Sequence, residues 1–371
     1  MKFIQISFLF LLVNLTQAEL VEISNKDGVR IMAEILDQSV DIIRIRKQDG
    51  GEFEVQISSL SESTKAMLRL RTRRPVQEDH RRPPSNAVKS SGYYLEIEEA
   101  RSFEATFSAS YRFPEFNSGK ISTFAPVPPS IDSQRVSTVT LTSQNSRSAK
   151  AETVEELNQG RQMLGLVVNA WDLGRDQTLD IEVTYAGILY ERELKKGNKP
   201  VKILPLSDQE RTDYTAKTET MDWGQDDLQL WLDSAGLRIK NRETAIDFGR
   251  RCYDYLVENS VYGGDTNSYR ARRPSEVCRT MTNDCGGLSL LFIAAMRAND
   301  IPARSLFGRW AQSQTSDYGQ FHVIAEFFDE SVGWIPVDIS SGIKRPKHHF
   351  GKQAGNLIIF HVDTDIAPIP G

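Results

Sequence analysis

One stretch constrains this chain more than any other: an apolar run that begins at Cys285 and stops before Pro302. A polar turn, residues 282–284, precedes the cysteine, and no charged side chain follows it until Arg297. Apolar side chains then recur at steps of three and four residues, the spacing of one helix face (Leu288, Leu291, Phe292, Ala295 and Ala298). The sequence therefore predicts a buried helix over residues 286–298 with Cys285 at its start.

The start of this helix is a favourable place for a reactive thiol. Either Asn283 or Asp284 is suited to cap the helix. A thiol at a helix N-terminus lies near the positive end of the helix dipole and near unpaired N–H groups, and both favour the thiolate. Gly286 and Gly287 have no side chains, so a substrate carbonyl could approach the sulfur, and free N–H groups could stabilise an oxyanion. We therefore predict that Cys285 is a nucleophile.

A histidine and an aspartate follow in two consecutive strand-like segments. His322 lies in FHVIAEFF, whose alternation is typical of a strand with one apolar face. Asp338 shares a face with Trp334 and Pro336 in the next segment, GWIPVDIS, and the turn between the segments predicts a hairpin. Antiparallel pairing would bring Asp338 to His322 and fix the tautomer of the ring. The order Cys285, His322, Asp338 is that of a nucleophile, a general base and an orienting carboxylate.

Residues 274–340 resemble the transglutaminase-like core, a branch of the papain-like cysteine enzymes. The resemblance rests on three motifs: the cysteine and apolar helix of NDCGGLSLLFIAAMRANDIPAR, the strand FHVIAEFF and the strand WIPVD. It implies that Cys285 is the nucleophile, His322 the general base and Asp338 the orienting carboxylate. The flanking segments ETAIDFGRRCYDYLVENSVY and HHFGKQAGNLIIFHVDTDI also resemble parts of the family. Residues 223–368 are therefore predicted to form the catalytic domain.

The chain departs from the family pattern at two positions. Asn283 stands where a glycine usually precedes the Asp-Cys pair, and Asp300 stands where a glycine usually precedes Ile-Pro. Both sites could be accommodated, since asparagine tolerates the left-handed backbone that glycine adopts. The side chain that donates to the oxyanion stays open, and the candidates are Trp310, Tyr262 and Gln320.

The resemblance implies acyl transfer through a thioester on Cys285, with a protein or peptide as substrate. We expect hydrolysis of peptide or amide bonds, because bacterial members are more often linked to hydrolysis and water is abundant. One alternative is a transglutaminase that cross-links or deamidates protein glutamines. Another is a binding or assembly protein that keeps the core without catalysis, although the three intact residues weigh against it.

Neither a metal nor an organic cofactor is expected for this chemistry. His348 and His349 are adjacent in KHHFGK, but the sequence offers no clear set of further ligands, so both are predicted to be loop residues. The net charge is −5, with 26% charged and 39% hydrophobic residues, which gives no general reason to expect a nucleic acid partner.

The N-terminus predicts export. Residues 1–18 combine Lys2, an apolar run from Phe3 to Val13 and a small-residue ending at Ala18, which is the pattern of a cleaved signal peptide. The run is short for a membrane span, and no other candidate span follows it. We therefore expect a secreted or periplasmic protein that has no membrane span after cleavage.

Export makes the three cysteines informative. An odd number in an exported chain suggests one reactive thiol, here Cys285, beside two that are paired or buried. Cys252 lies on an apolar helical face and Cys278 ends an apolar turn. A Cys252–Cys278 disulfide is possible, but the pattern favours two small core residues.

The rest of the chain is divided by composition. Residues 19–70 alternate with period two between Asp-Gly turns and resemble a small SH3-like β-barrel of the Sla-one homology type, expected to dock a protein or a cell-surface ligand. An Arg-, Pro- and Ser-rich linker spans 71–92, and alternating segments over 93–205 predict an antiparallel β-sandwich. A short helix is predicted at AETVEELN, residues 151–158. The predicted class is α+β, with the transglutaminase-like, papain-like core last.

Overall fold

The fold is described from a computed structural model. It describes residues 21–26, 29–38, 42–47, 51–60, 91–113, 119–144, 150–156, 161–173, 176–199, 203–264, 268–311 and 320–366. The predicted signal peptide and the linker up to residue 90 lie outside these ranges. Among the described residues, no helix combines the length and the apolar character needed to cross a membrane.

The first described unit is a small antiparallel sheet. Its strands pair in sequence order: β1 (Val21–Ser24), β2 (Arg30–Gln38), β3 (Ile42–Lys47) and β4 (Glu52–Gln56), followed by the turn η1 (Ile57–Ser59). Five buried side chains form its core (Ile23, Ala33, Ile43, Ile45 and Leu60). The described strands form an open row, and the closed SH3-like barrel expected from the sequence is not found among them.

Two further sheets share a second core. The first pairs β5 (Tyr93–Arg112) and β7 (Gln134–Ser143) with opposite edges of β10 (Thr178–Lys196). The second has the order β6 (Lys120–Pro126), β9 (Gln162–Asn169), β8 (Ala151–Glu155), and the turn η2 (Ala170–Leu173) follows β9. Apolar side chains of both sheets form one buried cluster (among them Ile121, Leu141, Leu166, Val168, Leu179 and Ile181).

The prediction of a short helix at AETVEELN is wrong for the first part of that segment. Residues Ala151–Glu155 are strand β8, which pairs antiparallel with β9 from Ala151 opposite Leu166 to Glu155 opposite Gln162. A helix of so few residues is marginal on its own, so pairing with a neighbouring strand overrides its local preference. The remainder of the predicted helix, from residue 157, lies outside the described residues.

The third part of the fold is a mixed helical and sheet core. Its sheet has the order β15 (Gly333–Val337), β14 (Phe321–Asp329), β13 (Ala303–Trp310), β17 (Leu357–Val362), with all neighbours antiparallel. Helix α6 (Cys285–Arg297) packs on β14 and β13, and every residue from Gly286 to Arg297 is buried. The other elements are α2 (Asp208–Asp213), α3 (Asp226–Ser234), α4 (Ala245–Asn259), β11 (Val261–Tyr262), η3 (Tyr269–Arg272), α5 (Pro274–Thr280), β12 (Thr282–Asn283), α7 (Ile339–Lys344), η4 (Pro346–His348) and β16 (Lys352–Ala354).

The end of α6 explains one departure from the family pattern. After Ala298, the chain turns through Asn299 to Asp300, which has a φ of 60°. That left-handed conformation is the one that favours glycine, and aspartate is among the few other residues that adopt it readily. Asp300 therefore supports the same turn that a glycine would.

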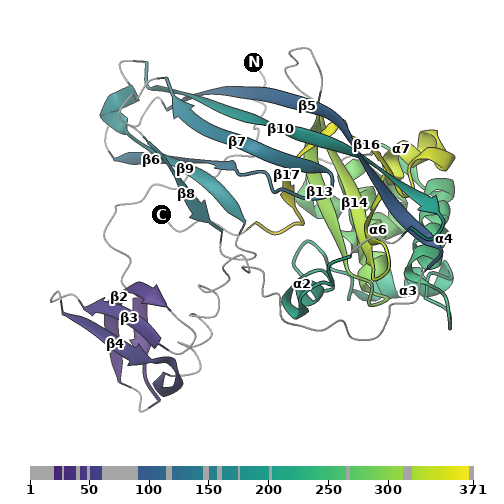
Figure 1. Ribbon diagram of the computed structural model, residues 1–371, viewed down its shortest axis with the longest axis horizontal. Helices are drawn as coiled ribbons and strands as arrows, with labels where there is room; N and C mark the ends of the chain where they lie inside the picture. The colour runs from purple at the N-terminus through teal and green to yellow at the C-terminus, as the bar shows by residue number, and fades with distance from the viewer. Residues whose placement is uncertain are drawn as a thin grey trace.

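A long ribbon joins the second and third parts of the fold. Strands β5 and β10 run together from the region of β6 and β9 to the helices around α4 (Figure 1). There β10 also pairs with β16, with Glu191 opposite Ala354 and Glu193 opposite Lys352. One continuous sheet therefore crosses the expected boundary between 93–205 and 223–368.

A buried ionic network fixes this junction. Arg192 of β10 and Glu326 of β14 are both wholly buried and form an ion pair. The second carboxylate oxygen of Glu326 accepts a bond from Nε of Arg304 at 2.9 Å, and Arg192 Nε donates to Gln353 Oε1 at 2.9 Å. Burial would raise the pKa of Glu326, but the two guanidinium groups lower it overall, so the carboxylate stays charged.

Candidate active site

Cys285 is the first residue of α6, and its helix begins with a side-chain cap. The cap is Asp284 and not Asn283: Asp284 Oδ1 accepts the N–H of Gly287 at 3.0 Å. The other carboxylate oxygen, Oδ2, accepts bonds from Arg272 Nε at 2.8 Å and Nη2 at 2.6 Å. These two bonds to one oxygen tie η3 to the first turn of α6, so the position of the thiol depends on two elements.

Asn283 has a different task from the one predicted. It is buried, its Nδ2 donates to the carbonyl of Ala271 at 2.8 Å, and its Oδ1 accepts the N–H of Asp284 at 3.0 Å. A Cβ on Gly287 would lie 2.1 Å from Asn283 Oδ1, which is far inside contact distance. Glycine at 287 is therefore required by the asparagine at 283.

His322 and Asp338 are brought together by the β14–β15 hairpin. Strand β15 pairs with β14 with Val337 opposite Ala325, so Asp338 continues towards the beginning of β14, where His322 lies. The two side chains are buried, and His322 Nε2 lies 2.7 Å from Asp338 Oδ2. The hairpin that the sequence predicted is present and carries both residues.

The carboxylate of Asp338 is held on its other side as well. Its Oδ1 caps α7, accepting the N–H of Ser341 at 2.9 Å and the hydroxyl of Ser340 at 3.0 Å. Its own N–H donates to the carbonyl of His349 at 2.9 Å. Two donors besides the histidine thus restrict where the carboxylate can point, and the backbone bond to His349 fixes the residue itself, which in turn restricts the imidazole.

The thiol of Cys285 also lies close enough to the imidazole of His322 to raise the pKa of the ring. Because Nε2 faces Asp338, the ring nitrogen left for the sulfur is Nδ1. Burial alone would lower the pKa of His322, but the interactions with Asp338 and then Cys285 raise it to about 9. Burial also acts against the charge of Asp338, yet its pKa is lowered, chiefly by His322. The pair is therefore an imidazolium and a carboxylate at neutral pH.

Two of the three candidates for an oxyanion donor lie at the site. Tyr262 lies close enough to Cys285 for the two groups to interact, and the pKa of Tyr262 is raised by burial and then by the negative charges of Cys285 and Asp284. Trp310 instead stacks on the His322 ring, with centroids 4.5 Å apart and planes 24° apart. Gln320 accepts the N–H of Trp310 through its backbone carbonyl, so the described contact is not one of its side chain. Tyr262 is the candidate that the geometry favours.

The other two cysteines are buried and free. Cys252 lies in α4 and Cys278 in α5, and no disulfide joins them. Burial raises the pKa of both thiols, that of Cys278 to about 11. This agrees with the interpretation of two core residues and separates them from Cys285, which is partly exposed.

The sequence reasoning missed several contacts around Cys285. Arg272 was not predicted to be part of the site. It lies 12 residues before Asp284 in the sequence and forms an ion pair with it. Lys344 lies with its Nζ 6.0 Å from the ring centroid of Tyr262. No sequence signal links these residues to the thiol, because the contacts depend on how η3 and α7 pack beside α6.

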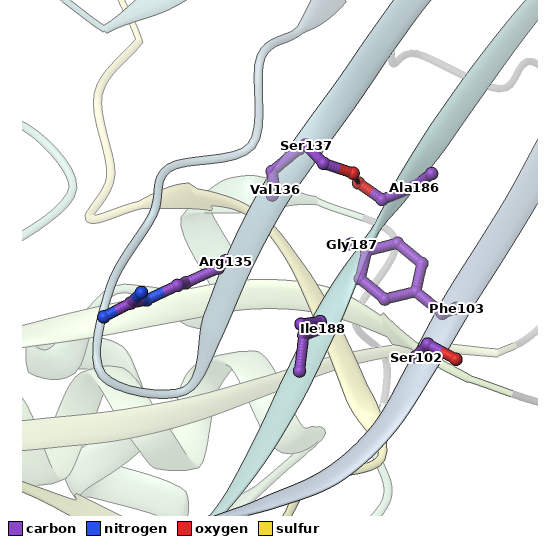
Figure 2. A pocket seen from close by; sticks show the side chains of 8 residues that line it. All are labelled: Ser102, Phe103, Arg135, Val136, Ser137, Ala186, Gly187 and Ile188. Atoms are coloured by element: carbon purple, nitrogen blue, oxygen red, sulfur yellow. Dashed lines mark hydrogen bonds between the residues drawn. The ribbon is translucent and has the colours of Figure 1, made fainter.

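Among the described residues no group of three or more His, Cys, Asp and Glu side chains could hold a metal ion. A shallow pocket of about 370 Å³ lies on β5, β7 and β10 (Figure 2). It follows the register shift next to Gly187, whose Cβ would lie 2.2 Å from the Arg135 carbonyl, and none of the residues around Cys285 lines it.

Comparison with known proteins places the core in a family. No curated protein matches the chain significantly. A crystal structure named a "Putative Cysteine Protease" from Cytophaga hutchinsonii matches with a TM-score of 0.52 and 16% identity, over 75% of this chain and 88% of that one. The periplasmic domain of TgpA from Pseudomonas aeruginosa gives a TM-score of 0.34 and 9% identity, over 70% and 90%. Residues 235–339 match the family model of the Transglutaminase-like superfamily, so the chain contains a transglutaminase-like domain.

Proposed function

We propose that the protein is an exported cysteine-dependent acyl-transfer enzyme that hydrolyses peptide or amide bonds through a thioester on Cys285. The observation that carries this proposal is the chain of contacts at the start of α6. Cys285 lies close enough to His322 to raise the pKa of the ring, and His322 Nε2 lies 2.7 Å from a carboxylate oxygen of Asp338. In this proposal Cys285 is the nucleophile, His322 the acid and base, and Asp338 the residue that orients the ring.

In the acylation step, the sulfur of Cys285 attacks the carbonyl carbon of the scissile amide, forming an S–C bond and an oxyanion. The Tyr262 hydroxyl, which lies near the same sulfur, is suited to donate to that oxyanion. The Gly287 N–H is not suited, because it already donates to Asp284. His322 gives its proton to the amine nitrogen, the C–N bond breaks, and the amine leaves a thioester on Cys285.

In the deacylation step, the neutral His322 takes a proton from water as the water oxygen attacks the thioester carbonyl. The C–S bond then breaks, the carboxylic acid leaves, and the thiolate and imidazolium are restored. A primary amine in place of water would give amine transfer by the same route. Hydrolysis is proposed because water reaches any open site, and the name of the Cytophaga hutchinsonii structure agrees with a hydrolytic reaction.

The export in this proposal rests on the signal-peptide pattern of residues 1–18. The N-terminal sheet, β1 to β4, is proposed to dock a protein or a cell-surface ligand, on the resemblance of residues 19–70 to an SH3-like module. A protein or peptide substrate follows from the family chemistry.

Alkylation of the native protein tests the nucleophile. Iodoacetamide at mildly acid pH is expected to label Cys285 rapidly, because His322 stays protonated there and supports a thiolate. Cys252 and Cys278 are internal controls that are expected to stay unlabelled while the protein is folded, because both are buried. Labelling as slow as that of an ordinary free thiol, or equal labelling of the Cys285→Ala variant, would contradict the proposal.

A second experiment distinguishes the acyl acceptors. One glutamine-containing protein is incubated with the enzyme and a fluorescent primary amine, and both amine incorporation and new peptide N-termini are measured. Hydrolysis predicts new N-termini with little incorporation, both lost in Cys285→Ala. Incorporation without cleavage would replace the hydrolase by a transglutaminase.

A further inference from the structure

The segment that follows Asp338 is unusually basic. From residue 343 to 352 the chain reads IKRPKHHFGK, with six basic side chains and no acidic one. Three of these side chains are exposed and do not form an ion pair within the described part of the chain: Lys344, Arg345 and His348. We call these three residues the basic rim. Lys352 is not part of it, because it pairs with Glu191 and Glu193.

The basic rim borders the mouth of the Cys285 site. Lys344 ends α7, the helix that Asp338 caps, and its Nζ lies 6.0 Å from the Tyr262 ring centroid. Tyr262 is half exposed and lies close enough to Cys285 for the charge of the sulfur to raise the pKa of the tyrosine. His349, in the same segment, accepts the N–H of Asp338 through its carbonyl at 2.9 Å, so this part of the segment lies beside the His322–Asp338 pair.

The acidic groups near the thiol already have cationic partners. Arg272 pairs with Asp284, and His322 pairs with Asp338. Arg250 lowers the pKa of Asp254, although burial of that carboxyl outweighs the effect. Glu258, at the exposed end of α4, offsets one rim charge at most. Lys344 and Arg345 therefore add two positive charges, in the segment that follows Asp338, with which no carboxylate of the described residues pairs.

We infer that the basic rim selects acyl substrates that carry a carboxylate beside the scissile amide, such as an acidic peptide. This inference rests on the proposed function and specifies its substrate class. A positive potential at a site entrance concentrates anions there. A lysine and an arginine at its edge can add charge-assisted hydrogen bonds to a carboxylate once it is bound.

Two alkylating reagents test the rim without knowledge of the substrate. Iodoacetate and iodoacetamide attack the same sulfur and differ in charge, so the ratio of their rate constants at Cys285 reports the local potential. Dividing by the iodoacetamide rate cancels changes in the amount of reactive thiolate. His322 contributes to the ratio in every variant alike. The variants are Lys344→Gln, Arg345→Gln and the double variant.

Lys240→Gln is the matched control, because it removes one exposed positive charge at the other end of α6. Ile239, next to it, bonds to Asn299 just beyond the C-terminus of that helix. A helix of 13 residues is about 20 Å long, and a unit charge at that distance in water changes the ratio by only about 1.4-fold without salt. Lys240→Gln is therefore expected to change the ratio less than either rim variant at low salt, and to leave it unchanged at physiological salt.

Removal of each rim charge is expected to lower the ratio about twofold at low salt, as for unit charges roughly 8 Å apart in water. The difference between wild type and the double variant should disappear at high salt. If the ratio is unchanged in the double variant while both reagents still label Cys285, the basic rim does not select anionic substrates. The proposed function is not affected by that result. Failure of both reagents to label Cys285 rapidly in the wild type would instead overturn the proposed function.

Discussion

At the scale of single residues, the ionisation of His322 decides what the site can do. Two opposing effects set its pKa of about 9. Burial lowers the pKa, and the interactions with Asp338 and Cys285 raise it by more than burial lowers it. The raised pKa also stabilises the fold. This contribution is complete below the ordinary histidine pKa of 6.5 and is lost as the pH rises through about 9.

Replacing Asp338 by Asn is expected to move the titration of His322 towards lower pH. The variant keeps the burial that lowers the pKa and loses the ionic partner that is the main cause raising it. NMR titration of histidine-labelled protein measures the shift, with His322→Gln to assign the signal. An unchanged midpoint near 9 would mean that the carboxylate does not hold the imidazolium.

A second residue-scale prediction concerns Gly287. Its replacement by Ala is expected to destabilise the protein by about 1–3 kcal/mol, because the new methyl group would overlap Asn283 Oδ1. The loss should be smaller in an Asn283→Gly background, although that change removes hydrogen bonds of its own. A double-mutant cycle from urea unfolding measures the coupling. Gly286→Ala is the control, since the nearest atoms there are 3.2 Å away or more and belong to side chains.

At the scale of elements, α6 is held at its start by a cap that is itself paired. Asp284 bonds to Gly287 through one oxygen and to Arg272 through the other. The helix start, and with it the thiol, is thus fixed to η3. Asp284 therefore makes two contributions, a helix cap and an ion pair, and a single substitution that removes both cannot distinguish them.

Asp284→Ser and Asp284→Ala are expected to differ. Serine can still cap the helix but cannot pair with Arg272, whereas alanine does neither. Loss of the cap should make Asp284→Ala less stable than Asp284→Ser by roughly 1 kcal/mol in thermal or urea unfolding. Equal stability of the two variants would show that the bond to Gly287 contributes little.

At the scale of the whole molecule, the β5–β10 ribbon makes the central sheets and the transglutaminase-like domain one structure. Arg192 reaches from β10 into the core and pairs with Glu326, four residues after His322 on β14. Glu326 also holds Arg304 of β13. A buried carboxylate between two guanidinium groups depends on both of them.

Arg192→Met is expected to destabilise the protein by about 3–5 kcal/mol, because it leaves Glu326 buried with one partner fewer. Lys195→Met on the same strand is the control and should change little, since the pair of Lys195 with Glu193 is exposed to solvent. Chemical unfolding followed by both tryptophan fluorescence and circular dichroism measures the effect. If Arg192→Met were as stable as Lys195→Met, the buried ionic network would not stabilise the junction.

The parts of the fold that could be predicted are those with local patterns. The helix at Cys285, the two strands that carry His322 and Asp338, and their hairpin each have a periodicity or a turn in the sequence. The juxtaposition of the three residues followed from the order of these elements. The strand Ala151–Glu155 was missed because its pairing with β9 is not local. The ion pairs of Arg192 and Arg272 could not be predicted for the same reason. The partner of Arg192 lies 134 residues away, and the partner of Arg272 lies 12 residues away. Both pairs depend on how separate elements pack, which no local pattern in the sequence indicates.

The shared edge between β10 and β16 has a consequence for how such chains can change during evolution. Exchanging residues 223–368 alone between relatives would separate β16 from β10 and Glu326 from Arg192. Successful recombination should therefore inherit residues 93–368 as one block. The breakpoint then falls before Tyr93, where β5 begins, and the N-terminal sheet is free to be gained, lost or replaced.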